Sequence, residues 1–175
     1  MSATESLIYS DMRFNDFDAN SCYRIEDAPL YKGTLKHLGF KTVEFVLCLK
    51  GIDDGQLKMM FVEAKPVIRP KFDNEIRQIS QKFIDALQIV CGIWHGGRKD
   101  EEALPPNFKE FMQNGKKIVF VLIVKNCDKS DLLPAQEAIY KKLQREHALW
   151  KFEVKVLNEE LAKKENLVLE EEIIE

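Results

Sequence analysis

Two neighbouring stretches of the chain, residues 42–50 and 56–65, are rich in apolar residues and show a period of two. The sequence Gly-Ile-Asp-Asp-Gly at 51–55 separates them. Such a period is typical of β-strands, and a short linker rich in glycine and aspartate is typical of a hairpin turn. The pattern therefore predicts an antiparallel hairpin with Asp53-Asp54 as its two-residue turn.

This turn fixes which residues of the two strands face each other. On one face it pairs apolar residues throughout, namely Val43 with Ala64, Phe45 with Val62 and Leu47 with Met60. The other face holds Val46 opposite Phe61 and Cys48 opposite Met59. On this second face the register also places Glu44 opposite Glu63. Lys65 is expected on the same face, because strand side chains alternate.

Two facing carboxylates are costly, since their Cβ atoms lie only about 4.5–5.5 Å apart and like charges there destabilise a sheet. Such a pair raises the pKa of one acid or attracts a cation, and magnesium prefers carboxylate oxygens. A lysine beside the acids can orient or deprotonate a water molecule, or stabilise charge on a phosphate. Glu44, Glu63 and Lys65 are therefore candidates for a metal-dependent phosphodiesterase site. The alternative is a surface salt-bridge triad, in which an exposed pair stabilises by only ~0–1 kcal/mol.

The segment Phe61-Val-Glu63-Ala-Lys65 resembles the E-x-K strand of the PD-(D/E)XK nucleases, which have the restriction-endonuclease-like fold. In that family an acid on one strand of a hairpin and E-x-K on the next bind magnesium for phosphodiester hydrolysis. The resemblance implies that Glu44 and Glu63 are catalytic metal ligands for Mg²⁺ or Mn²⁺, and that Lys65 is catalytic. Glu44 stands where the family usually has aspartate, and no Pro-Asp dipeptide precedes the hairpin.

The resemblance also implies site residues outside the hairpin. Many members of the family carry a further acid on an upstream element, and Glu26 is the candidate for this catalytic position. Related nucleases often place a glutamine or lysine from the helix after E-x-K near the metal, so Gln81 and Lys82 are candidates for substrate contact. The alternative for Gln81 and Lys82 is that both simply face water.

Downstream of the hairpin the apolar residues recur with a helical period. Pro66 and Pro70 end the strand, Asp73 or Asn74 can cap the helix, and Gly92 is expected to close it. The apolar side of this helix consists of Ile76, Ile79, Phe83, Leu87 and Val90. The period therefore predicts one long amphipathic helix directly after the E-x-K strand.

The rest of the chain alternates between helical and strand patterns. A loop over 95–107 precedes a short helix over 108–113 that ends at Gly115, and a strand over 118–124 is apolar on both faces. A second long helix is expected to begin at Ser130 or Asp131, with Pro134 in its first turn, and a half-exposed strand covers 152–157. A strand, a helix and a strand in succession predict a parallel crossover.

The predicted fold class is α/β with a mixed central sheet. The sheet combines the antiparallel hairpin with the parallel βαβ crossover, and helices cover both faces. The order hairpin, helix, strand, helix, strand is that of the restriction-endonuclease-like core, which the resemblance extends in outline over about 20–160. We expect one domain over 1–175, with 1–20 and 165–175 at its periphery.

Composition narrows the class of protein. With 45% hydrophobic and 31% charged residues, the chain has an ordinary globular composition. No apolar run approaches the ~20 residues of a membrane helix. The first residues do not resemble a secretory signal, so we expect a cytoplasmic protein without a membrane partner. Four cysteines without C-x-x-C spacing and three scattered histidines do not fit the usual zinc patterns.

A net charge of −3 argues against a large sequence-independent surface for nucleic acid. Basic residues nevertheless gather in sequence around the proposed site: Lys32, Lys36, Lys41, Lys65, Arg69, Lys71 and Arg77. Two hypotheses follow. The first is a Mg²⁺- or Mn²⁺-dependent nuclease acting on nucleic acid, with DNA favoured. The second is a catalytically inactive binding or assembly module of a nucleic-acid-processing or defence complex. Either form is expected to depend on a protein partner or a second copy of the chain.

Overall fold

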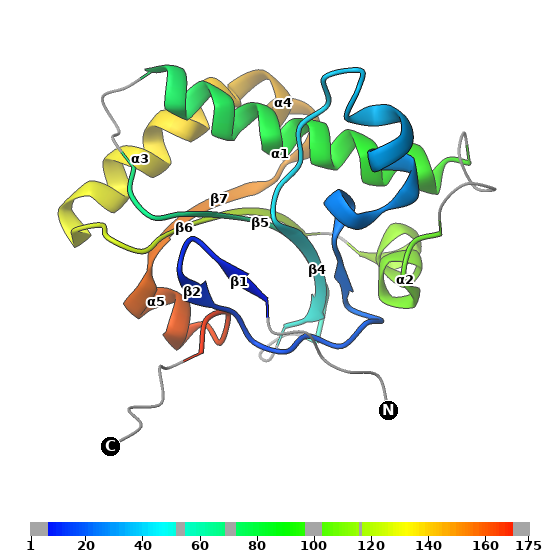
Figure 1. The fold of residues 1–175 in the computed structure, drawn as a ribbon, viewed down its shortest axis with the longest axis horizontal. Helices are drawn as coiled ribbons and strands as arrows, with labels where there is room; N and C mark the ends of the chain where they lie inside the picture. Colours follow the sequence, from blue (N-terminus) through cyan, green and yellow to red (C-terminus); the bar gives the residue numbers. More distant parts are fainter. Residues whose placement is uncertain (1–6, 52–54, 69–72, 97–102, 116, 170–175) are drawn as a thin grey trace.

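A five-stranded mixed sheet forms the centre of the protein (Figure 1). The computed structural model describes residues 7–51, 55–68, 73–96, 103–115 and 117–169. The strands lie in the order β3 (Cys22–Tyr23), β4 (Phe45–Lys50), β5 (Leu57–Lys65), β6 (Lys117–Val124) and β7 (Glu153–Asn158). The pairings β3–β4 and β4–β5 are antiparallel, whereas β5–β6 and β6–β7 are parallel. The predicted α/β class with a mixed sheet is therefore confirmed.

The hairpin of β4 and β5 has the predicted register. Phe45 faces Val62 and Cys48 faces Met59. The ladder begins at Phe45, and one residue earlier the backbone N–H of Glu44 donates to the carbonyl oxygen of Val62 at 3.0 Å. The predicted turn at Asp53-Asp54 lies outside the described residues. At its base, Gly51 N–H donates to the carbonyl oxygen of Gln56 at 2.8 Å.

Val43 departs from the predicted pairing. It was expected to face Ala64 on one side of the hairpin, but the two residues belong to hydrophobic cores on opposite faces of the sheet. The physical reason is a bend of the backbone at Glu44, which takes the chain out of the strand before Val43 is reached.

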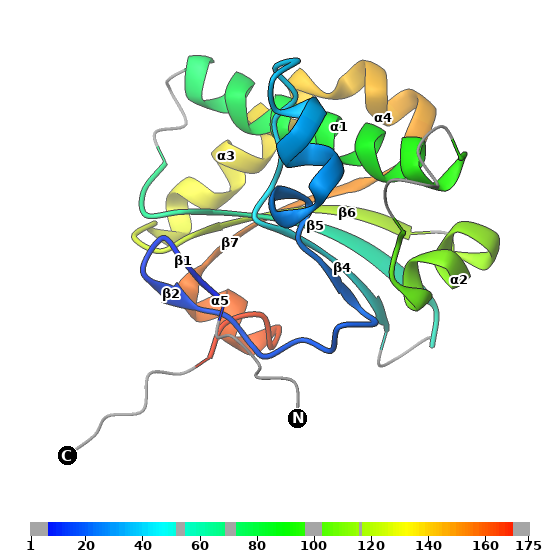
Figure 2. The ribbon, with the colours of Figure 1, turned by 45° about the vertical axis from the view of Figure 1, so that its right-hand side comes forward.

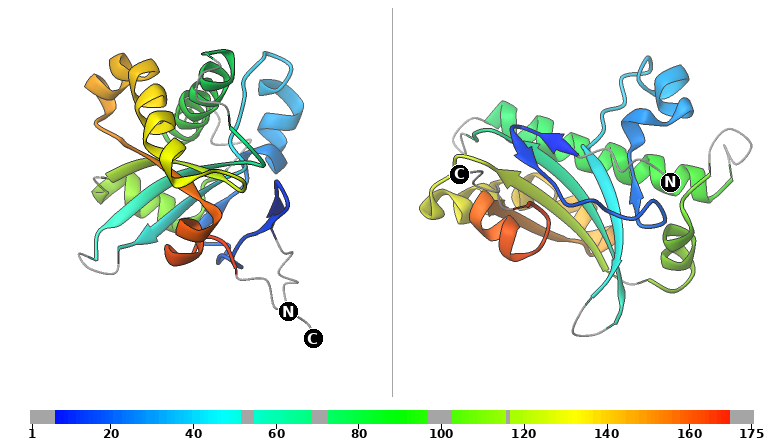
Figure 3. Two further views of the ribbon diagram at one scale, coloured as in Figure 1. Left: turned by 90° about the vertical axis from the view of Figure 1, so that its left-hand side faces the viewer. Right: turned by 60° about the horizontal axis from the view of Figure 1, so that its bottom comes forward.

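Helices cover both faces of the sheet, as predicted. One face carries α1 (Asp73–Trp94), α3 (Lys129–Lys142) and α4 (Gln144–Trp150), which Figure 2 shows above the strands. The other face carries α5 (Glu159–Lys164) and the small hairpin of β1 (Ile8–Tyr9) and β2 (Met12–Arg13), which Figure 3 shows from below. The helix α2 (Pro106–Asn114) contacts β4 and β5 and ends at Gly115 as expected.

The core under α1 is built from aromatic rings. Phe83 of α1 stacks on Phe120 of β6 with 4.8 Å between ring centroids, and Phe61 and Phe152 contact Phe120 edge-on or tilted. All four side chains are fully buried. Burial of an aromatic side chain is among the largest single contributions to a core. This stack therefore fixes the position of α1 over β5, and α1 in turn carries Lys82.

Several helix boundaries differ from the sequence expectations. The helix α1 runs through Gly92 to Trp94, because the buried Ile93 keeps its last turn packed. The helix α3 begins at Lys129 with Asp128 as its N-cap, so Pro134 lies inside the helix rather than in its first turn. The loop expected over 95–107 lies partly outside the described residues. None of the described helices combines the length and apolar character needed to cross a membrane.

The segments near both ends of the described chain pack into the hydrophobic core on the face of the sheet opposite to α1, and not at the periphery. Phe14 and Val168 form an isolated antiparallel bridge, and both side chains are buried. Phe14 also contacts Phe45 of β4 with ring centroids 5.1 Å apart. The segments near both termini therefore close the face of the sheet that α1 leaves open.

Candidate functional site

Glu63 lies in the middle of the sheet with none of its surface exposed to solvent. Its strand, β5, runs between β4 and β6, and its side chain is on the face covered by α1. Burying a carboxylate is very unfavourable unless other groups compensate its charge and hydrogen bonds. The neighbours of Glu63 therefore indicate what this position is built for.

Two lysines approach the same oxygen of Glu63. Lys82 Nζ, from α1, donates a hydrogen bond to Oε1 at 2.7 Å, and Lys65 Nζ, from β5 itself, lies 3.3 Å from Oε1. The predicted approach of Lys82 from the helix side is confirmed. Lys82 and Lys65 keep 26% and 32% of their side-chain surface exposed, so both ammonium groups lie at the boundary between core and solvent.

The second oxygen of Glu63 is left unpaired. Oε2 is buried, and no group in the described parts of the chain forms a hydrogen bond with it. A buried polar atom without a partner costs about 1–3 kcal/mol, and more when it is charged. In a purely structural ion pair, further hydrogen bonds normally satisfy the remaining lone pairs. Oε2 is therefore a buried acceptor whose cost no described residue offsets.

Glu44 is partly buried beside this cluster. Burial, and after it the charge of the Glu63 carboxylate, raises the pKa of its carboxyl from 4.5 to about 7. The ammonium groups of Lys82 and Lys65 oppose this shift. These couplings agree with the sequence prediction that the two hairpin acids and the lysine share one face.

Glu26 lies at the rim of the site. It is an exposed residue of the short 3₁₀ helix Ile25–Asp27, and its charge raises the pKa values of Glu44 and Tyr31. The adjacent Asp27, not Glu26, forms the described ion pairs with Arg24 and Lys32. Glu26 is therefore within electrostatic reach of the hairpin acids, in agreement with the expectation of a nearby upstream acid.

Gln81 takes a different role from the one expected. Its side-chain amide donates to Oδ1 of Asp85 at 2.6 Å on the same helix, not to the hairpin acids. Asp85 was not anticipated as a site residue, although its position four residues after Gln81 permits this contact. Its Oδ2 accepts the backbone N–H of Lys41 at 2.9 Å, a contact across 44 residues of sequence that no local pattern reveals.

The carboxylates of Glu44 and Glu63 suit magnesium or manganese, which need few protein ligands, better than a metal that is bound by three or more side chains. Among the described residues, no group of three or more His, Cys, Asp or Glu could hold a metal ion. Glu44 and Glu63 offer carboxylate oxygens, and one of them, Oε2 of Glu63, is free of hydrogen bonds within the described chain. Magnesium is commonly bound by one or two carboxylates and keeps several water molecules. The residues present therefore fit such an ion.

A groove of about 350 Å³ lies on the face of the sheet opposite to α1. Its walls include Lys58 and Lys117 from the strands and Lys164 from α5, over a floor of Leu49 and Met60. Glutamates are also present there, and Lys117 and Lys164 form ion pairs at 2.8 and 2.7 Å with Glu153 and Glu160. This groove contains none of the candidate site residues, so it gives no second location for the chemistry.

Comparisons with known proteins identify no relative. No family model, no curated protein and no solved structure matches this chain. The function is therefore inferred from the chemistry of the side chains around Glu63.

Proposed function

We propose that this chain is a Mg²⁺- or Mn²⁺-dependent nuclease of the PD-(D/E)XK type that hydrolyses phosphodiester bonds of nucleic acid, with DNA favoured. The single observation that carries the proposal is the buried Oε2 of Glu63, which has no hydrogen-bond partner among the described residues. This oxygen lies beside a second carboxylate, that of Glu44. The other oxygen of Glu63 contacts the ammonium groups of Lys65 and Lys82. A cation bound at Oε2 would compensate both the missing hydrogen bond and the repulsion between the acids.

The roles follow from exposure and position. Glu44 and Glu63 would hold the ion, which on binding activates water and neutralises charge on the phosphate. Lys65 is the more exposed of the two lysines, so its ammonium is suited to stabilise charge that develops on a phosphate oxygen. Lys82 is closer to Glu63 and fixes the orientation of that carboxylate. Glu26 is suited to orient water at the rim of the site.

The order of elements gives further support. The hairpin of β4 and β5, the helix α1, the strand β6, the helix α3 and the strand β7 follow in the order expected for the restriction-endonuclease-like core. The segment before β4 carries three exposed lysines, Lys32, Lys36 and Lys41, of which Lys32 pairs with Asp27. Such charge favours contact with a phosphate backbone. Arg69 and Lys71 lie outside the described residues.

The second candidate is a binding or assembly module that keeps the fold without turnover. One observation favours it: both lysines already contact the carboxylate that would hold the ion. In that case Lys82 and Lys65 would replace the metal as the compensating charge.

The test is thermal unfolding with increasing Mn²⁺, followed by incubation with end-labelled duplex DNA and single-stranded RNA. An ion that binds only the folded chain raises its unfolding free energy, by about 2.7 kcal/mol at a hundred times the dissociation constant. We expect this rise in the wild type and its loss in Glu63→Gln. Glu110→Gln is the matched control, because Glu110 pairs with Lys50 at the far end of β4.

The outcomes separate the candidates. Stabilisation through Glu63 together with cleavage supports the nuclease. No stabilisation by Mn²⁺ and no cleavage of either substrate would assign the chain to the binding module, in which the two lysines replace the metal. An equal rise in melting temperature for the wild type and Glu63→Gln would show that Mn²⁺ binds elsewhere, and the proposed site would be wrong.

A further inference from the structure

The segment that delivers Glu44 to the site lies outside the regular strand pairing of β4 and β5. Glu44 precedes β4, at a bend of the chain, so regular strand pairing does not yet constrain it. Its backbone N–H reaches Val62, but the residues before it leave the sheet. Something outside the sheet must therefore keep this segment close to β5.

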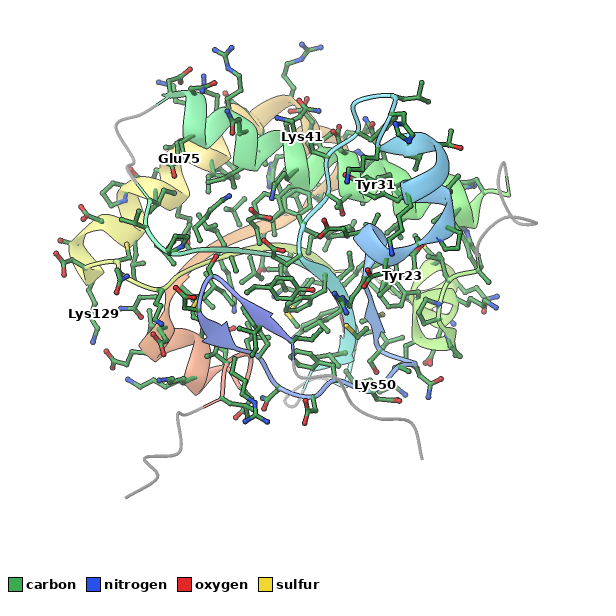
Figure 4. The ribbon with its side chains drawn as sticks, in the orientation of Figure 1. Tyr23, Tyr31, Lys41, Lys50, Glu75 and Lys129 are labelled. Carbon is green, nitrogen blue, oxygen red and sulfur yellow. The ribbon has the colours of Figure 1, made fainter. Side chains whose placement is uncertain are left out.

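The peptide between Phe40 and Lys41 is bonded at both of its polar atoms. Tyr31 Oη donates to the carbonyl oxygen of Phe40 at 3.1 Å, and the N–H of Lys41 donates to Asp85 Oδ2 at 2.9 Å. A peptide group is planar, so two bonds from opposite sides fix its position and its orientation together. Figure 4 labels Tyr31 and Lys41, which lie beside α1 on the helical side of the sheet.

Asp85 is itself held in place. It is 7% exposed, and its other oxygen accepts the amide of Gln81 at 2.6 Å. Gln81 and Lys82 are adjacent on α1. Gln81 orients Asp85, and Lys82 orients Glu63. The carboxylate of Asp85 has one partner on each oxygen, and a buried acid is stable only when it is satisfied in this way.

The force that this arrangement opposes is the repulsion between Glu44 and Glu63. Like charges in facing positions destabilise a strand pair, and burial of Glu44 adds a desolvation cost. A segment free to move would turn the Glu44 side chain towards water. We infer that Asp85 and Tyr31 are positioning residues, which clamp the Phe40–Lys41 peptide and thereby hold the Glu44 carboxylate beside Glu63 for ion binding. The part of this inference that concerns the ion rests on the proposed function.

The experiment compares four variants. Asp85→Leu removes both acceptors at similar size, whereas Asp85→Asn keeps an acceptor for Lys41 and a polar partner for Gln81. Tyr31→Phe removes only the hydroxyl. Ile89→Val, a trimmed buried residue on α1, controls for general destabilisation. Mn²⁺ affinity is measured by calorimetry, and amide hydrogen exchange at Glu44 is measured by NMR without metal.

We expect Asp85→Leu to weaken Mn²⁺ binding by roughly 10-fold or more, because partners that orient metal ligands typically contribute 10–100-fold. Asp85→Asn should restore affinity to within a few-fold of the wild type, and Tyr31→Phe should give an intermediate loss. A purely structural role predicts the opposite pattern, in which affinity stays at the wild-type value in every folded variant. That pattern would overturn the inference.

The exchange measurement separates this inference from the proposed function. If the wild type binds no Mn²⁺, the metal site is wrong, but the clamp is still tested. Faster exchange of the Glu44 amide in Asp85→Leu and Tyr31→Phe than in Ile89→Val would show that the clamp holds this segment. Equal exchange in all three would show that it does not.

Discussion

Lys82 Nζ lies 2.7 Å from Glu63 Oε1, across the interface between α1 and the central strand β5. The contact joins an ammonium group with limited exposure to a carboxylate with none. Lys65 Nζ reaches the same oxygen from a longer distance, 3.3 Å, and from a more exposed position. The two lysines are therefore unequal partners of Glu63, and their substitutions should have unequal effects.

Lys82→Met should destabilise the metal-free protein strongly. Removing one partner of a buried pair costs about 3–5 kcal/mol, because the remaining charge stays buried, and the partial exposure of Lys82 places the expected loss near the lower value. Lys65→Met should cost only about 1 kcal/mol, as expected for a pair open to solvent. Urea denaturation of both variants measures the difference. Equal losses would contradict the ranking by distance and burial.

The stability of the metal-free protein should fall as pH rises from about 4.5 to about 7. The pKa of Glu44 is near 4.5 in the unfolded chain and about 7 in the folded one, so the folded state binds the proton more tightly. The stabilisation that comes from this tighter proton binding is complete below pH 4.5, the pKa in the unfolded chain. It is lost as the pH rises through about 7, the pKa in the folded protein. Because Glu44 is partly exposed, we expect about 1–2 kcal/mol for this loss.

Glu44→Gln provides the control for this pH dependence. The amide does not titrate, so the part of the slope between pH 4.5 and 7 that is due to Glu44 should disappear. Denaturant melts of the wild type and the variant at several pH values measure it. A slope that is the same in both proteins would assign the effect to another group.

Apparent Mn²⁺ affinity should increase with pH up to about 7 and then level off. Metal ligands must lose their protons before they bind, so below the pKa of Glu44 each pH unit should change the affinity by about 10-fold. Calorimetric titrations between pH 5.5 and 8, in about half-unit steps, test this. An affinity that does not vary over this range would show that Glu44 is not a ligand.

Lys65→Ala should separate ion binding from turnover. Lys65 is assigned a role on the phosphate and not on the ion, so the Mn²⁺-induced rise in melting temperature should persist. Cleavage should fall by about 10²–10³-fold, the usual effect of removing one group that stabilises transition-state charge. Single-turnover cleavage of labelled DNA gives the rate. A variant that cleaves at the wild-type rate would exclude Lys65 from catalysis.

The sequence was sufficient where local patterns decide the structure. The period of two and the turn determined the hairpin register from Phe45 to Lys50. Glu44, one residue before this ladder, is still within electrostatic reach of Glu63 and Lys65. The helical period placed Lys82 on the polar side of the next helix, and only the resemblance to the nucleases indicated that it approaches the hairpin, where it contacts Glu63. The same reasoning failed for Val43, since the period of two carries no signal for the bend at Glu44.

Contacts between distant segments could not be predicted for the same reason. Phe14 and Val168 come from opposite ends of the chain and form a bridge. The hydrogen bond between Lys41 and Asp85 likewise links two segments that are far apart in sequence. Short elements such as β1 and α5 carry too few residues to show a clear period, and packing against the sheet decides their conformation. The acids of the site were therefore visible in the sequence, whereas the residues that hold them in place were not.

The position of β5, between an antiparallel and a parallel neighbour, has a consequence for the order of folding. Its antiparallel partner is adjacent in sequence, whereas its parallel partner lies beyond α1 and α2, and nearby pairings form sooner than distant ones. Glu44 and Glu63 therefore meet before α1 brings Lys82 to them, at a stage when the hairpin supplies only Lys65. The hairpin is therefore expected to form before the second ammonium group that offsets its acids is in place.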